Sequence, residues 1–177
     1  MKGNFSQFQN CLRIQITPDE YAYERIQGLV SHCKKFGFNN VIFLTTGEEF
    51  FLGHLRREEI KPWVEVVKNA SKLLRANKIG VSLHHWIGVG HLDRGIGLKE
   101  DQNFTTMVDF NGKQSISVAC PLDEKWQEHF KNLLGYLVKE VQPDYYWVED
   151  DFRLHNHAPL EWGGCFCENH IAKFNSK

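Results

Sequence analysis

The sequence has 177 residues, of which 42% are hydrophobic and 13% aromatic, and its formal net charge is −1. This composition excludes a disordered chain and suits one domain with a sizeable core. The near-neutral charge excludes the basic surface with which proteins bind nucleic acids or anionic lipids. No apolar run approaches the length of about 18 residues that a membrane helix needs, and nothing near Met1 resembles a signal peptide. We therefore expect a soluble, cytoplasmic protein with no nucleic-acid partner and no membrane partner.

Strand and helix patterns alternate along the first part of the chain. Residues 12–17 alternate apolar and polar side chains as a strand does. Residues 20–36 repeat apolar side chains at helical spacing, and Gly37 is placed to end that helix. The unbroken apolar run 40–45 is typical of a strand in a parallel sheet that is covered on both faces. A second helix is predicted over 58–77.

The middle of the chain continues the same alternation with one insertion. Residues 79–86 predict the third strand, and a loop rich in glycine follows it. Residues 104–119 then predict a β-hairpin, because Asn111-Gly112 is a strong turn signal between two strand-like runs. A third helix is predicted over 123–141, with an aspartate as its N-cap.

The last part of the chain predicts a fourth strand over 145–148 and a fourth helix that begins near Gly163. Four strand–helix units in succession predict an α/β fold with a parallel sheet and right-handed crossovers. They amount to about half of a (β/α)8 barrel, which normally needs about 250 residues. We expect residues 1–177 to form a single, partial TIM-barrel-like domain. A compact α/β sandwich with a doubly wound sheet is the alternative.

Five cysteines, an odd number at uneven spacing, do not suggest a disulfide framework. In a reducing compartment, clustered cysteines more often bind metal or react than pair. Cys165, Cys167 and His170 form the pattern C-x-C-x-x-H, which places three zinc donors on a turn that leads into a helix. Cys120 is the natural fourth donor, because it lies between the hairpin and the third helix, on the face where the loop of the fourth strand emerges. These residues predict a closed Cys3His structural zinc site.

An alternative interpretation of this cluster involves no metal. Free cysteine is often a small apolar core residue, and His170 would then lie on the surface. We assign Cys11 and Cys33 to this second class, on a strand margin and on a helix face.

Three consecutive acidic residues, Glu149, Asp150 and Asp151, follow the fourth predicted strand. Carboxylates at the carboxyl end of a strand are typical of active sites in (β/α)8 barrels. Adjacent carboxylates repel one another, which raises the pKa of at least one of them and suits a general acid near neutral pH. Successive strand residues face opposite sides, so we expect Glu149 and Asp151 on one side and Asp150 on the other. The alternative is a solvated loop in which these acids pair with Arg153.

Aromatic, basic and imidazole side chains near the predicted strand ends are candidates for binding a substrate. Tryptophans are suited to stacking on the apolar face of a sugar, and an arginine is suited to holding a carboxylate. Of the two adjacent histidines on the third strand, one is expected to face inward and the other to be packed. The candidate substrate-binding residues are Trp86, His84, His85, Arg153, His155 and Trp147.

The stretch from Cys120 to Phe174 resembles the first half of the family 42 glycoside hydrolases, the zinc-carrying β-galactosidases of the wider retaining (β/α)8 clan. Members of that family carry, in this order, a cysteine–proline pair, a strand that ends in aspartate-asparagine-glutamate, and a C-x-C-x-x-C cluster. The matching residues here are 120–121, 147–151 and 165–170. The resemblance implies a carbohydrate substrate, hydrolysis of O-glycosidic bonds and a structural zinc ion. His170 replaces the last cysteine, and zinc accepts either ligand.

Two departures from the family bear on the chemistry. Asp151 stands at the position of the acid/base glutamate, so the resemblance implies that Asp151 is the general acid, with Glu149 or Asp150 orienting it or binding hydroxyls. Retaining chemistry needs two carboxyls about 5 to 5.5 Å apart, and an inverting pair lies about 6.5 to 9.5 Å apart. The family's nucleophile comes from a seventh strand, which this sequence does not include. We expect a homodimer partner or a missing C-terminal half to supply it.

Two other functions compete with hydrolysis of glycosides. The first is a non-catalytic, zinc-stabilised module that binds a carbohydrate or a protein. The second is metal-dependent hydrolysis by His84, His85 and the acidic residues, but the sequence contains no helix-borne H-E-x-x-H pattern to support it.

Overall fold

The structure is a computed structural model that describes all residues except 1–8, 46–52, 86–95, 148–159 and 162. Contacts within the chain group it into two compact units. The sheet unit comprises Met1–Gly47, Glu58–His85 and Leu137–Trp147. The hairpin unit comprises Glu48–Arg57, Trp86–Tyr136 and Val148–Lys177. The expectation that the whole chain acts as one partial barrel domain stays a prediction.

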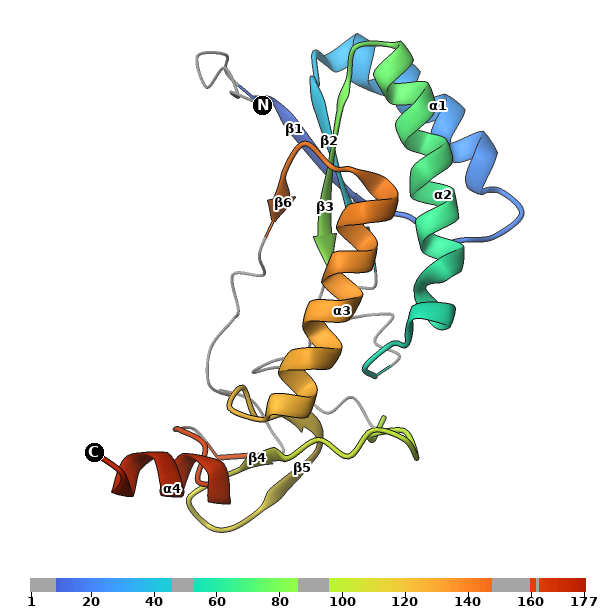
Figure 1. The fold of residues 1–177 in the computed structure, drawn as a ribbon. Helices are drawn as coiled ribbons and strands as arrows, with labels where there is room; N and C mark the ends of the chain where they lie inside the picture. The colour runs from blue at the N-terminus through green and yellow to red at the C-terminus, as the bar shows by residue number, and fades with distance from the viewer. Residues whose placement is uncertain (1–8, 46–52, 86–95, 148–159, 162) are drawn as a thin grey trace. The chain divides into compact units, whose positions relative to one another are not determined.

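A parallel sheet forms the centre of the sheet unit (Figure 1). Its strands, in chain order, are β1 (Cys11–Gln15), β2 (Asn40–Thr45), β3 (Gly80–His85) and β6 (Tyr146–Trp147). They lie side by side in the order β1-β2-β3-β6, and each pair is parallel. The predicted α/β fold with parallel β/α units is therefore confirmed. The order never reverses among these strands, as in part of a (β/α)8 barrel, whereas a doubly wound sheet contains a reversal.

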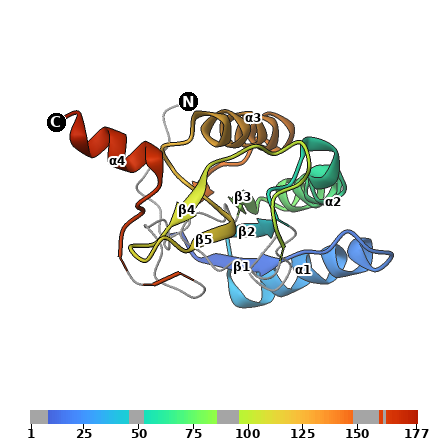
Figure 2. The same ribbon diagram turned by 90° about the horizontal axis from the view of Figure 1, so that it is seen from below.

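Helices α1 (Ala22–Phe36) and α2 (Arg57–Ala76) lie side by side on one side of the sheet (Figures 1 and 2). Both were predicted from apolar periodicity, to within two residues at each end. Alternate residues of β2 and β3, among them Phe43 and Leu83, are fully buried and give the sheet one apolar face. Buried side chains of α1, such as Val30, need this apolar face as their partner.

The start of β3 is packed without any spare space. A Cβ added to Gly80 would lie 2.5 Å from Asn40 Nδ2 and 2.9 Å from Asp144 Oδ2. The same Asp144 oxygen accepts a hydrogen bond from Val81 N at 2.7 Å, so it cannot move away without losing that bond. Only glycine lets the ends of β2, β3 and the segment before β6 approach this closely.

Each segment of the hairpin unit follows β2, β3 or β6 in the chain. Its regular elements include an antiparallel pair, β4 (Thr106–Val108) and β5 (Gln114–Ala119). The turn between them contains Gly112, whose φ of 82° is the left-handed conformation that glycine adopts readily. Asp109 Oδ1 accepts hydrogen bonds from Asn111 N and Lys113 N, both at 2.9 Å. The hairpin predicted from Asn111-Gly112 is confirmed.

Helix α3 (Glu124–Val141) begins where the sequence predicts. Asp123 caps it, because its Oδ1 accepts a hydrogen bond from Trp126 N at 2.8 Å. Helix α4 (Glu168–Asn175) begins five residues later than predicted, so the start near Gly163 is wrong. Gly163 has a φ of 146°, and Cys167 is still extended, so the segment between them runs as irregular backbone up to the helix.

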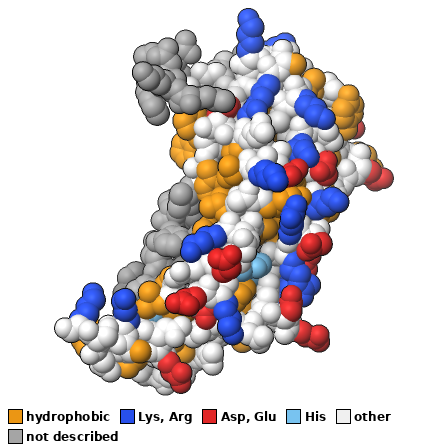
Figure 3. Space-filling model, in the orientation of Figure 1, with side chains coloured by type: hydrophobic (Ala, Val, Ile, Leu, Met, Phe, Trp, Pro, Cys, Tyr) orange, Lys and Arg blue, Asp and Glu red, His pale blue; other side chains and the backbone are white. Residues whose placement is uncertain are grey.

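No helix among the described residues combines the length and the apolar content that crossing a membrane requires. On the face drawn in Figure 3, lysine and arginine side chains are interspersed with aspartate and glutamate, and that face carries no large area of one charge. This mixture agrees with the near-neutral composition.

A buried histidine of the hairpin unit makes its stability dependent on pH. His54 packs edge-on against Phe104, with ring centroids 5.4 Å apart, and its Nε2–H donates to the carbonyl of Ser117 at 2.7 Å. Burial lowers the pKa of His54 to about 4, against an ordinary value of 6.5, and the bond to Ser117 offsets only part of this effect. The folded chain therefore holds the imidazole neutral well below neutral pH.

We expect acid to destabilise the hairpin unit before most carboxylates titrate. Between pH 6.5 and 4, His54 binds a proton in the unfolded chain but not in the folded chain. The free energy of unfolding therefore falls by about 3 kcal/mol as the pH falls through this range. Urea titrations across this range, compared with the His54→Gln variant, measure the effect. The variant should show a shallower loss, whereas His32→Gln, at an exposed position on α1, should keep the wild-type slope. Equal slopes for all three proteins would contradict the prediction.

The Gly80→Ala variant should lose between about 1 and 3 kcal/mol of unfolding free energy, because its methyl group must displace Asn40 or Asp144. Gly28→Ala is the matched control in the same unit, since nothing lies within 4 Å of the added Cβ there. Gly28 lies inside α1, so its replacement by alanine should stabilise the protein by about 0.5 to 1 kcal/mol. Urea unfolding measures both changes, and a Gly80→Ala variant as stable as the wild type would refute the close packing.

Candidate metal centre

Cys120 comes directly after β5 and is fully buried. Its backbone N–H donates to the carbonyl of Thr105 at 2.8 Å, which extends the hairpin pairing by one residue. The N–H of Leu122 points at the Cys120 sulfur at 3.4 Å. Backbone N–H groups directed at sulfur stabilise a thiolate, so this turn is suited to a metal ligand.

Cys165 and Cys167 reach the same place from the other end of the hairpin unit. The residue between them, Phe166, donates its N–H to the carbonyl of Val108 at 2.7 Å. This bond holds the segment alongside β4, and the two cysteines on either side of Phe166 are both buried. Cys167 is the residue before α4, so that His170 follows within the first turn of the helix.

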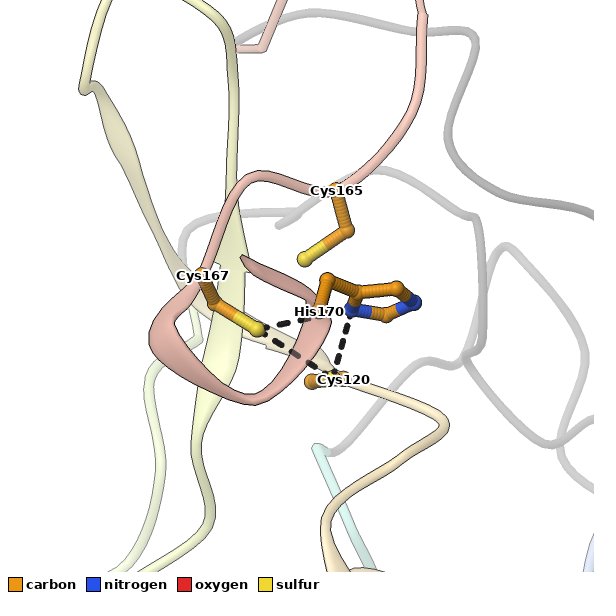
Figure 4. A group of neighbouring side chains, drawn as sticks. All are labelled: Cys120, Cys165, Cys167 and His170. Atoms are coloured by element: carbon orange, nitrogen blue, oxygen red, sulfur yellow. Dashed lines mark hydrogen bonds between the residues drawn. The ribbon is translucent and has the colours of Figure 1, made fainter. Parts of the chain in front are cut away.

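The four predicted ligand residues converge (Figure 4). Their ligand atoms all lie within 4.8 Å of one another. His170 Nδ1 lies 3.2 Å from Cys120 Sγ and 3.5 Å from Cys167 Sγ, and the two sulfurs are 3.4 Å apart. A disulfide needs about 2.05 Å between sulfurs, so these cysteines are free thiols. Ligands at about 2.3 Å in a tetrahedron are separated by about 3.8 Å, which is close to the observed spacing.

Apolar side chains surround the sulfurs. Met107 and Val118, which are both buried, belong to the same core cluster as the three cysteines, together with Leu160. These apolar side chains keep water away from the ligand atoms, so a metal bound there would be shielded from exchange with solvent.

The three thiols compete for negative charge. The thiol of Cys120, with the N–H groups of Cys167 and Val108, lowers the pKa of Cys165 well below its ordinary value. The same contact with Cys165, together with burial, raises the pKa of Cys120, and burial raises that of Cys167. One sulfur is therefore easily ionised, while the other two resist further negative charge. A divalent cation would allow all three thiols to ionise together, because its positive charge stabilises each thiolate.

Most of the predicted catalytic and substrate-binding residues lie outside the described part of the chain. These residues are Glu149, Asp150, Asp151, Trp86, Arg153 and His155. Their roles therefore stay predictions.

The two adjacent histidines of β3 lie on opposite faces of the sheet. His85 Nδ1 lies 3.0 Å from Thr45 Oγ1, on the apolar face that α1 and α2 cover, and both side chains are buried. His84 lies on the other face, where it pairs in register with Trp147 of β6. Of the two, His84 therefore shares its face with a predicted substrate-binding residue, and His85 does not.

Sequence analysis missed Gln15, at the end of β1. Its Nε2 is buried without a hydrogen-bond partner in the described structure. The alternation of residues 12–17 contained the signal, because it places Arg13 and Gln15 on the polar side of a strand whose other side is apolar.

Comparisons with known proteins give little further information. No protein-family model matches the chain, and no curated protein matches it. Among solved structures, one match is the IolI protein, determined with a binding zinc atom. The two chains share 17% sequence identity with a TM-score of 0.35, and the match covers 82% of this chain and 69% of the other. The likeness to family 42 glycoside hydrolases therefore rests on the residues quoted for it.

Proposed function

We propose that Cys120, Cys165, Cys167 and His170 hold one structural zinc ion that joins the segment carrying α4 to the β4–β5 hairpin. The observation that carries this proposal is the gathering of three sulfurs and one imidazole nitrogen within 4.8 Å. Sulfur and imidazole ligands in a set of four are the donor set of structural zinc sites. Softer metals bind such sets too, but zinc combines this ligand set with a tetrahedral geometry and no redox chemistry.

The burial of the ligands favours a structural role over a catalytic one. A catalytic zinc keeps one coordination position open to water, whereas four protein ligands fill a tetrahedral shell. Here the cysteines are at most 7% exposed. His170 is half-buried, and four protein ligands would leave no coordination position for a substrate.

Helix α4 shows why a metal would be needed. It has eight residues and no buried side chain. A helix this short is unstable alone in water, and α4 has no apolar face in the core to hold it. Outside the ligand cluster, Asn169 of α4 donates a hydrogen bond from Nδ2 to Thr105 Oγ1, and at 3.4 Å this bond is long and therefore weak. The three ligands 165, 167 and 170 would fix both the start of the helix and the extended segment before it.

The purified protein should contain one zinc ion per chain, and chelation should lower the unfolding free energy of the hairpin unit by about 3 kcal/mol or more. The Cys165→Ser and Cys167→Ser variants should lose the metal, because serine is a poor zinc ligand. Elemental analysis and thermal unfolding, with and without chelator, measure both effects.

Two variants serve as controls for this experiment. Cys11→Ser, at a cysteine outside the cluster, should keep the zinc ion, and His170→Cys should keep it because a thiolate can replace the imidazole. Metal-free protein whose stability does not respond to added zinc would refute the proposal.

A second function is favoured by the position of the acidic residues in the chain. We propose that the chain is a glycoside hydrolase or the N-terminal half of one, acting on carbohydrate. In the sequence, Glu149, Asp150 and Asp151 follow the end of β6 after one residue, and the strands β1, β2, β3 and β6 of its sheet lie parallel in chain order. Active-site residues of (β/α)8 barrels come from this end of the strands. The resemblance of residues 120–174 to family 42 supports the same function.

In this proposal Asp151 is the general acid, and Glu149 or Asp150 orients it or binds hydroxyls. The nucleophile comes from a second copy in a homodimer or from a C-terminal half of the barrel. A protein without hydrolytic activity would be the zinc-stabilised binding module instead.

The hydrolase proposal predicts slow release of nitrophenol from nitrophenyl β-galactoside. Asp151→Asn should reduce kcat by a factor of about 100 to 10,000, because it removes the proton donated to the leaving group. Asp19→Asn, at an exposed residue that pairs with Arg25, is the matched control and should keep full activity. Absence of hydrolysis at every protein concentration, with zinc bound, would refute hydrolysis by a homodimer of this chain and leave the structural zinc proposal intact.

A further inference from the structure

A hollow of about 500 Å³ lies between α1 and α2, the two helices that cover the sheet (Figure 1). Its lining includes residues of both helices, which are Tyr23, Ile26, Gln27, Lys72, Leu73 and Ala76. On each helix these positions follow the spacing of three and four residues that places side chains on one face. The hollow therefore follows the line where the two helices meet, and its volume lies within the range of small-molecule sites.

The hollow has an apolar floor. Ile26 is only 3% exposed, Leu73 is half-buried, and Ala76 adds a small apolar side chain. The ring of Tyr23 stands beside this floor and is 69% exposed. Its hydroxyl accepts a hydrogen bond from Gln27 Nε2 at 2.8 Å, which restricts the movement of the ring. A flat apolar surface is thus in place before any ligand arrives, which lowers the entropic cost of binding.

Lys72 is the one charged side chain among the residues that line the hollow. Within the described part of the chain, Lys72 has no hydrogen bond and no ion pair, whereas Lys68, one turn earlier on α2, is held by Glu65 and Glu140. No carboxylate lines the hollow to repel an anion. A single ammonium group beside an apolar floor is complementary to a molecule that has an apolar body and one negative charge.

We propose that this hollow binds a medium-chain fatty carboxylate that is free in solution. The alkyl chain lies along the line between α1 and α2, over Ile26 and Leu73 and against the ring of Tyr23. The carboxylate accepts hydrogen bonds from Lys72 Nζ. A linear chain suits a lining that follows two neighbouring helices. The site is independent of the zinc ion and of the hydrolase function.

The experiment follows two side chains of the floor while the full-length protein is titrated with hexanoate, octanoate and decanoate, below the concentrations at which they form micelles. In a sample with ¹³C-labelled methyl groups, the signals of Ile26 and Leu73 are assigned from their loss in Ile26→Val and Leu73→Met. Both signals should shift and saturate with one dissociation constant. Each added methylene should tighten binding about two- to fourfold, because it buries more of the chain. Ile60, fully buried on α2 outside the hollow, is the internal control and should not shift.

The role of charge is tested with octylammonium, which has the same alkyl chain as octanoate but the opposite charge. It should bind about fivefold more weakly than octanoate or worse, because Lys72 repels it. Lys72→Gln should weaken octanoate binding about two- to fivefold and abolish the preference for the anion. Lys61→Gln, at an exposed position of α2 outside the hollow, removes the same charge and should leave both dissociation constants unchanged.

The role of the aromatic ring is tested by a second pair of variants. Tyr23→Ala should weaken binding of decanoate about threefold or more, because it removes apolar surface beside the floor. Tyr21→Ala is the matched control, since Tyr21 is 57% exposed and lies outside the hollow. It should leave the dissociation constant of decanoate unchanged.

Each outcome decides the inference. Saturable shifts at Ile26 and Leu73, with a preference for the anion that Lys72→Gln abolishes and Lys61→Gln keeps, support it. Equal binding of octanoate and octylammonium, or no saturable shift with any carboxylate, overturns it. Shifts that extend to Ile60 indicate unfolding by a detergent and also overturn it. Signals of the floor that move with protein concentration alone mean that a second copy covers the hollow, which again overturns the proposal.

Discussion

Three sulfur atoms and one imidazole nitrogen meet in an apolar pocket of the hairpin unit, and the end of the chain depends on what holds them together. Without a cation, the sulfurs compete for charge, since ionisation of Cys165 discourages that of Cys120. The apolar surroundings increase this cost because they offer no solvent to spread the charge. Helix α4 contributes no buried side chain of its own. Its position is therefore coupled to the ligand cluster more than to any packing.

The sheet unit obeys a different constraint, which is the alternation of side chains along a parallel strand. One face is apolar and is covered by α1 and α2, and the other carries polar residues such as Gln15, Ser82 and His84. Because neighbouring strands are parallel and in register, residues far apart in the chain meet at one level.

Much of this organisation follows from local patterns in the sequence. Apolar periodicity located α1, α2 and α3, and Asn111-Gly112 located the hairpin, because turns and helices depend on residues close in the chain. The predicted start of α4 near Gly163 is wrong because the backbone stays irregular as far as Cys167, which places two sulfurs before the helix begins. The requirement of the ligand cluster overrides the local helix signal there.

By itself the sequence determined the parallel α/β class and the C-x-C-x-x-H spacing, since both depend on short-range periodicity. It also suggested Cys120 as the fourth ligand, from its place beside the hairpin. Only the tertiary structure decided that the sulfur of Cys120 lies 3.4 Å from that of Cys167, 47 positions away. Likewise, only the strand register could align Gln15 with His84 and Trp147. Register arises from packing between strands distant in the chain, and no local pattern encodes such an alignment.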